Sequence, residues 1–79
     1  MRVRVLVTPK PGVLDPEGRA VHRALADLGY AAATDVRTGR VILLELATSD
    51  PDEARAQVGE MCEKLLANPV IEEYSVELV

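Results

Sequence analysis

The chain has 79 residues, of which 48% are hydrophobic although none is Phe or Trp, and a formal net charge of -4. This length predicts a single domain over residues 1–79 with a small aliphatic core, which contacts in an oligomer would supplement. The acidic balance argues against a nucleic-acid binder, and the longest apolar run, residues 41–44, is far too short to span a membrane.

The sequence shows no charged leader followed by an apolar segment and a cleavage site. Its single cysteine cannot form a disulfide within the chain. We therefore expect a cytoplasmic protein.

Residues 2–8, RVRVLVT, alternate between charged and apolar side chains, which predicts a β-strand. A helix is expected to begin near Pro16, because Asp15 can accept hydrogen bonds from its first turn and proline suits the first helical position. Apolar residues recur in this helix at spacings of three and four, so we expect that face to pack on a sheet. Gly29 followed by Tyr30 predicts a Schellman ending.

The next segment combines alternation through residues 34–38 with an apolar run at residues 41–46. A turn near Thr38, Gly39 and Arg40 would divide it into a hairpin of two strands. Because the second strand is apolar on both faces, it should be covered on both faces.

A second helix start is marked by Asp50 and Pro51. Apolar residues then follow at helical spacing, and we expect Cys62 to be buried beside Leu65 in this stripe. Pro69 should end the helix, and an alternating final strand should follow from about residue 70.

The predicted order is β-α-β-β-α-β, an α+β fold of the ferredoxin-like type. Right-handed crossovers would give a four-stranded antiparallel sheet with both helices on one face. The other face would lack a cover while the third strand still points apolar side chains toward it. We therefore expect a dimer or a larger homo-oligomer.

Candidates for chemistry are few. Cys62 lacks the cationic neighbour or helix N-terminus that activates a thiol, and His22 is alone. No phosphate-binding glycine motif is present, although Lys10 beside a helix N-terminus is a candidate for a small anion contact. Arg37 and Arg40 would flank the hairpin turn and are candidates for docking a partner. The residues alone therefore indicate a binding or assembly module.

The segments VLDPEGRAVHRALADLGY, DVRTGR and CEKLLANPVIEEY occur in this order in the chain. They resemble the PurS family, the small subunit of phosphoribosylformylglycinamidine synthase, from about Val3 to Val76. The chain departs from the family's pattern at Pro9, which affects only how far the first strand should extend.

The resemblance implies a role in purine biosynthesis, where the complex converts formylglycinamide ribonucleotide to the amidine with ATP and glutamine. In the family a PurL-type synthetase and a PurQ-type glutaminase carry the chemistry, and use ATP, Mg²⁺ and glutamine. The small subunit implied here would be a dimer or tetramer that helps the two assemble and pass on ammonia. It would be part of a C–N ligase without catalytic residues or cofactors of its own, and would bind neither nucleic acid nor membrane.

Within that resemblance a few positions are expected to matter for subunit contacts or local geometry. They are Lys10, Asp15, Gly18, Arg37, Gly39 and Asn68. Gly18 is the least explained by helix propensity, and close approach of another backbone would account for it. The alternative is an ACT-like regulatory domain, which shares the predicted element order and binds a small metabolite at a dimer interface.

Overall fold

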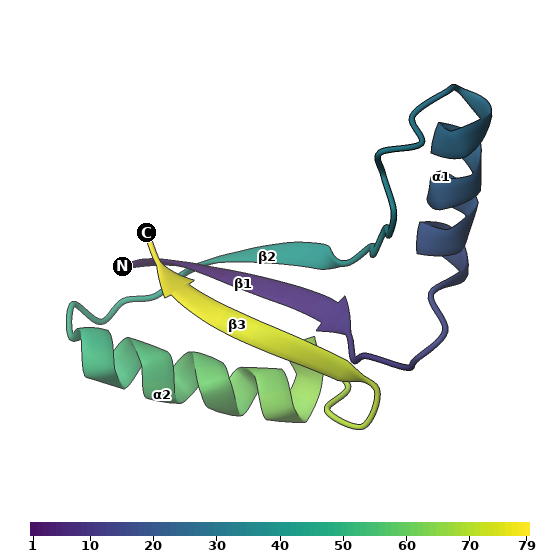
Figure 1. Cartoon of the computed structure of the whole chain (residues 1–79). Helices are drawn as coiled ribbons and strands as arrows, with labels where there is room; N and C mark the ends of the chain where they lie inside the picture. The colour runs from purple at the N-terminus through teal and green to yellow at the C-terminus, as the bar shows by residue number, and fades with distance from the viewer.

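The computed structural model describes all residues, 1–79, as a three-stranded antiparallel sheet with two α-helices and a π-helical turn (Figure 1). The elements are β1 (Arg2–Pro9), α1 (Pro16–Asp27), β2 (Arg40–Glu45), α2 (Pro51–Met61), η1 (Cys62–Leu66) and β3 (Glu72–Leu78). β1 lies between β2 and β3. None of the helices has the length and apolar character that a membrane span requires.

The expected hairpin before residue 40 is wrong, and the sheet has three strands instead of four. Residues 31–39 run back alongside α1 instead of pairing with β2 as a strand. The Val36 carbonyl lies against Gly18, and the backbone N–H of Thr38 donates to the Asp15 carboxylate at 2.7 Å. The N–H of Thr38 thus finds its acceptor at the start of α1 instead of on a neighbouring strand.

The expectation that both helices cover one face of the sheet is also wrong. Figure 1 shows α2 lying along the sheet, while α1 stands apart beyond the end of β1. The apolar stripe of α1 is consequently exposed, with Val21 39% and Leu28 73% accessible. The amphipathic pattern of α1 was correctly predicted, but the pattern does not indicate that the chain itself supplies no cover for the apolar face.

The helix ends follow the sequence signals. The carboxylate of Asp15 caps α1 by accepting from the N–H of Gly18. At the other end Gly29 has a φ of 97°, and the N–H of Tyr30 donates to the Leu25 carbonyl at 2.9 Å. This is the expected Schellman ending.

The core lies between β1 and α2. Val3, Val5 and Val7 are buried and point toward α2, where Ala54 and Val58 are also buried. The alternation of β1 thus places one complete row of valines against the helix.

The opposite face of the sheet has no helix on it. Leu6 pairs in register with Val41, and Leu43 lies beside them across from Arg4. Val41 is 55% and Leu43 67% exposed, so the expected apolar character on both faces of this strand is present, with cover on one face only. This uncovered patch consists of Leu6, Val41 and Leu43.

The π-helical turn overturns one expected core contact. The N–H of Ala67 donates to the carbonyl of Cys62, five residues earlier, at 3.1 Å. The extra residue in this turn rotates the residues that follow, so that Ala67 is buried while Leu65 is 82% exposed. Cys62 is buried as expected, and burial raises the pKa of its thiol.

This turn predicts opposite outcomes for neighbouring leucines. Leu66 packs against the core, and Leu66→Ala should lower the free energy of unfolding by about 2 kcal/mol. Leu65→Ala should change it by less than about 0.5 kcal/mol, because the side chain is exposed. Urea denaturation of both variants at one protein concentration measures the difference. Equal losses would show that the turn is a regular α-helix in solution.

The molecule is elongated and can be divided into three parts. The body is residues 1–9 and 40–79, the arm is residues 10–39, and the neck is the part of the arm nearest the body, residues 10–15 and 36–39. The chain measures 47 × 25 × 14 Å, and its radius of gyration is 15.7 Å, against about 12 Å for a compact chain of this length.

Candidate functional site

The neck is held together by one carboxylate. Asp15 accepts hydrogen bonds from the N–H of Gly18 at 2.9 Å and from the N–H and hydroxyl of Thr38 at 2.7 and 2.8 Å. The backbone donor of Thr38 is the main cause that lowers the pKa of Asp15, followed by that of Gly18, with the nearby Arg37 adding to it. Asp15 therefore joins the two chain segments of the neck and caps α1 at the same time.

Arg37 fixes the neck on its other side. Its guanidinium donates to the carbonyl of Pro9 at 2.7 Å and to that of Lys10 at 3.0 Å. It thus binds backbone within its own chain and does not flank a hairpin turn.

Two glycines make the close approach in the neck possible. A Cβ on Gly18 would lie 2.6 Å from the Val36 carbonyl oxygen, and one on Gly39 would lie well inside van der Waals contact with the Val7 carbonyl oxygen. Both glycines are therefore required by backbone of the same chain. For Gly18, this explains a residue that helix propensity disfavours.

The N-terminal cap of α1 is an unfavourable place for a small anion, because a carboxylate is already there. The Asp15 carboxylate already occupies the N-terminal N–H group of Gly18. A second negative charge there would be repelled by that carboxylate. The expected anion contact beside Lys10 has no geometric support at this helix end.

Asn68 lies apart from the neck, in a second polar cluster below the start of β3. Its side chain accepts from the N–H of Val70, and its own N–H donates to Glu72 at 2.7 Å. Arg40 also binds Glu72 and donates to the Leu66 carbonyl, which closes the end of η1. The hydrogen bond from Arg40, then that from Asn68, lowers the pKa of Glu72.

The structure thus gathers Lys10, Asp15, Gly18, Arg37 and Gly39 in and beside the neck and leaves Asn68 outside it. Sequence reasoning missed Thr38, whose two donors satisfy Asp15. It also assigned Arg40 to a turn, although its guanidinium is held by Glu72. Thr38 and Glu72 both lie in segments that carry the family resemblance, but nothing in the residues around them indicates that they pair with Asp15 and Arg40.

No arrangement of nucleophile and base accompanies these clusters. Cys62 is buried, and the imidazole Nε2 of His22 lies 2.9 Å from the Ala33 carbonyl oxygen, where it ties the returning segment to α1. Nowhere in the chain do three or more His, Cys, Asp or Glu side chains group closely enough to hold a metal ion.

The largest surface groove lies on α1, with a volume of about 350 Å³. It is lined by Leu14, Pro16, Arg19, Ala20 and Arg23. This groove faces away from the apolar stripe of α1, because Arg19 and Arg23 lie on the opposite side of the helix from Val21 and Leu28. The arm therefore presents an apolar surface and a basic surface.

Comparison with known proteins places these features in a family. Residues 2–79 match the family described as PurS, phosphoribosylformylglycinamidine (FGAM) synthase. A PurS subunit of this synthase from Bacillus subtilis is 48% identical over 77 residues, which cover 98% of this chain and 90% of that protein.

Solved structures of PurS chains are also similar to this chain. The PurS subunit of Thermotoga maritima superposes with a TM-score of 0.90 at 32% identity, covering 99% of this chain and 90% of that one. A chain in the structure of PurLQS from the same organism gives a TM-score of 0.89 at 32% identity, covering 99% and 95%. These matches favour the PurS resemblance over the ACT-like alternative. The chain belongs to the PurS family of phosphoribosylformylglycinamidine synthase subunits, which act in purine biosynthesis.

Proposed function

We propose that this chain is the assembly subunit of its synthase and contributes no catalytic residue or cofactor of its own. In this role it brings a PurL-type synthetase and a PurQ-type glutaminase together and supports the transfer of ammonia between them. ATP, Mg²⁺ and glutamine are used by those partners. The name of the PurLQS structure, which contains a similar chain, supports this choice of partners.

The observation that carries the proposal is the amount of surface that the isolated chain leaves exposed. Its accessible area is 5553 Å², whereas a compact monomer of 8.6 kDa exposes about 4,700 Å². The excess, roughly 850 Å², is close to the area that one protein contributes to a standard interface. Contacts with other chains would bury this excess surface.

Part of this surface suits a second copy of the chain. The uncovered patch, Leu6, Val41 and Leu43, is apolar and flanked by the ion pairs Arg2–Glu45 and Arg4–Glu77. Burying such a patch against its equivalent on another copy is the favourable solution for an open sheet. We therefore propose a dimer or tetramer in which the bare sheet faces meet.

Omission of the chain tests the proposed function. The purified synthetase and glutaminase subunits are mixed with ATP, Mg²⁺ and glutamine, with and without this chain, and product formation and comigration are followed. We expect glutamine-dependent product only when the chain is present, and product from ammonium chloride in either case. Full glutamine-dependent activity without the chain would contradict the proposal, and turnover by the chain alone would contradict its non-catalytic role.

A further inference from the structure

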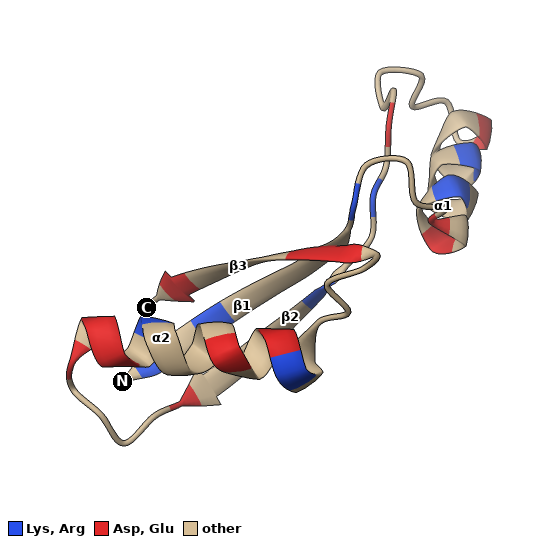
Figure 2. Cartoon of the chain, turned by 90° about the horizontal axis from the view of Figure 1, so that it is seen from below, with Lys and Arg blue, Asp and Glu red and all other residues tan.

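The positive charges of the body and of the arm are used differently. Every Lys and Arg of the body lies within 4.0 Å of a carboxylate of the same chain. No such partner exists for the Lys and Arg of the arm, which are Lys10, Arg19, Arg23 and Arg37. Figure 2 shows them as blue bands on α1 and on the two segments of the neck.

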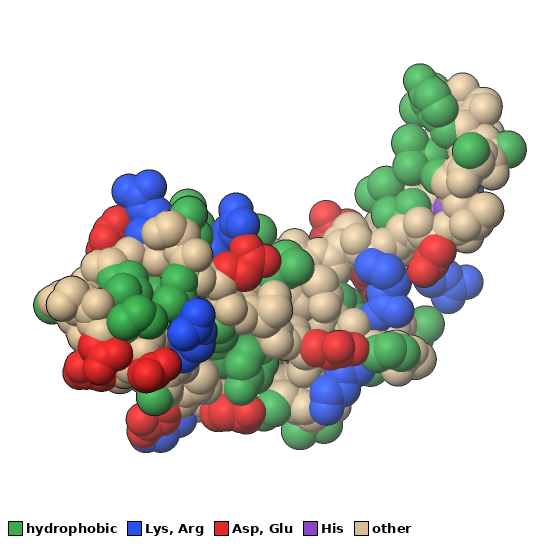
Figure 3. All heavy atoms as spheres, turned by 60° about the vertical axis from the view of Figure 1, so that its left-hand side comes forward, with side chains coloured by type: hydrophobic (Ala, Val, Ile, Leu, Met, Phe, Trp, Pro, Cys, Tyr) green, Lys and Arg blue, Asp and Glu red, His purple; other side chains and the backbone are tan.

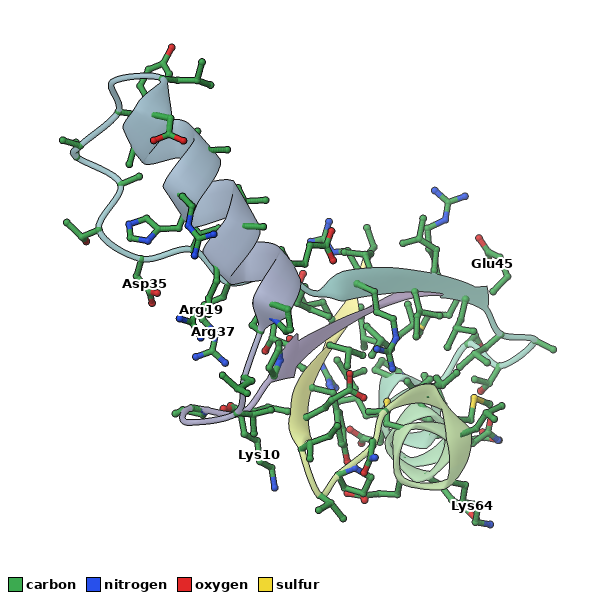
Figure 4. The ribbon with its side chains drawn as sticks, turned by 90° about the vertical axis from the view of Figure 1, so that its right-hand side faces the viewer. Lys10, Arg19, Asp35, Arg37, Glu45 and Lys64 are labelled. Atoms are coloured by element: carbon green, nitrogen blue, oxygen red, sulfur yellow. The ribbon has the colours of Figure 1, made fainter.

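Arg19 and Arg23 are the most available of these groups. Arg37 is held by two backbone carbonyls, and Lys10 is half-buried, whereas both residues of α1 are exposed. They lie one helical turn apart and line the groove with the exposed side chain of Leu14. Figure 4 shows Arg19 at the base of α1, on the same side of the neck as Arg37 in that view.

This surface does not suit a small phosphate compound. The N-terminus of α1 is already capped by the carboxylate of Asp15, whose negative charge would oppose a phosphate at that end. The remaining donors are side chains on an open surface, as Figure 3 shows for the basic groups where the arm meets the body. Forked guanidinium groups beside an apolar side chain match carboxylates on a protein surface.

A second copy of the chain is a poor source of those carboxylates. Every Asp and Glu of the body except Glu73 already accepts an ion pair or hydrogen bond from its own chain. On the arm, Asp15 is likewise engaged, whereas Glu17, Asp27 and Asp35 have no such partner. Glu17 lies on the far side of α1, and Asp27 is the one carboxylate of the helix on the side of Arg19 and Arg23, so two α1 helices meeting through this side would bring four guanidinium groups against two carboxylates. That contact would be repulsive.

We propose that the groove lined by Arg19 and Arg23 is the docking surface for an acidic surface on another subunit of the synthase. The inference rests on the proposed function and locates one of its contacts. The apolar stripe lies on the other side of α1 and is not part of this surface.

Charge reversal on the intact chain tests the inference. The variant Arg19→Glu/Arg23→Glu is compared with Arg55→Glu/Lys64→Glu, which makes the same charge change on α2 of the body. The affinity of each labelled chain for the mixed synthetase and glutaminase subunits is measured by fluorescence anisotropy at 0.1 M and 1 M salt. Sedimentation equilibrium gives self-association, and circular dichroism confirms folding.

We expect the arm variant to bind the partners about tenfold more weakly at 0.1 M salt, and the body variant to stay within about twofold of the original chain. The difference should nearly vanish at 1 M salt, where the Debye length falls from about 10 Å to about 3 Å. Self-association should not change. If the reversed charges prevent folding, Arg19→Gln/Arg23→Gln should show the same order of effects with smaller amplitude.

Several results would overturn the inference. These are unchanged affinity of the arm variant, equal weakening by both variants, or loss of self-association in the arm variant alone. Binding of inorganic phosphate or ATP to the isolated chain that the arm variant abolishes would assign the groove to an anion. If the original chain supports glutamine-dependent turnover and the arm variant does so with equal affinity, the inference fails while the proposed function stands. If the original chain does not bind the partners, both fail.

Discussion

Replacing Gly39 by alanine is expected to lower the free energy of unfolding by about 1–3 kcal/mol. The new Cβ would overlap the Val7 carbonyl oxygen and crowd the methyl group of Thr8. Neither can move easily, because both belong to β1, which pairs with strands on both sides. Thermal unfolding at a fixed protein concentration measures the loss, which should appear as a fall of about 4–8 °C for each kcal/mol.

Gly59→Ala is the matched control. It makes the same substitution in the middle of α2, where an added Cβ would meet nothing within 4 Å. Removing a glycine from a helix interior should raise the stability by about 0.5–1 kcal/mol. If Gly39→Ala behaved like this control, the close approach in the neck would not exist in solution.

Substitution of Asp15 should open the neck. Asp15→Ala removes the cap of α1 and leaves both donors of Thr38 without their acceptor. We expect a greater loss of stability than for Asp50→Ala, which removes only the cap of α2 and should cost about 1 kcal/mol. Urea denaturation of both variants makes the comparison, and equal losses would show that Thr38 gains nothing from Asp15.

The same carboxylate gives the neck a pH dependence of known sign. The pKa of Asp15 is lower in the folded chain than its ordinary value of 3.8, so its ionised form is favoured by folding. This contribution is complete above the unfolded-state pKa and is lost as the pH falls through the lower folded pKa. The stability advantage over Asp15→Asn should therefore be constant near neutral pH and shrink below about pH 4. An advantage that grows on acidification would contradict this assignment.

Local signals in the sequence were reliable. Asp15 and Asp50 cap the two helices, Gly29 ends the first, and the valines of β1 form the buried row. Each of these features depends on residues within a few positions of one another or on the period of one element. Such information is complete in a short stretch of sequence.

Features that depend on distant partners were not predictable. Alternation at Thr34, Val36 and Thr38 is compatible with a strand. In the structure this segment instead contacts the start of α1, where Thr38 donates to Asp15 and the Val36 carbonyl lies close to Gly18. The π-helical turn changed which leucine is inside, although Leu65 and Leu66 are equivalent in hydrophobicity. In both cases the deciding contact lies elsewhere in the chain.

The candidate site also contains some residues that were predicted from the sequence and others that were not. The family resemblance grouped six positions, of which the structure brings five to or beside the neck and leaves Asn68 apart. The five are Lys10, Asp15, Gly18, Arg37 and Gly39. Their roles in subunit contacts stay a prediction, because the contacts that the structure shows are within one chain. The availability of Arg19 and Arg23 emerged only once the ion pairs of the body were known.

The arm also has a topological consequence. β1 and β2 are consecutive strands paired antiparallel, with Val7 opposite Arg40, so residues 10–39 form one long insertion into an otherwise ordinary β-hairpin. The buried valine core against α2 includes none of that insertion. A tight turn in its place should therefore leave a small, self-sufficient unit, which would separate the ability to fold from the ability to recruit other chains.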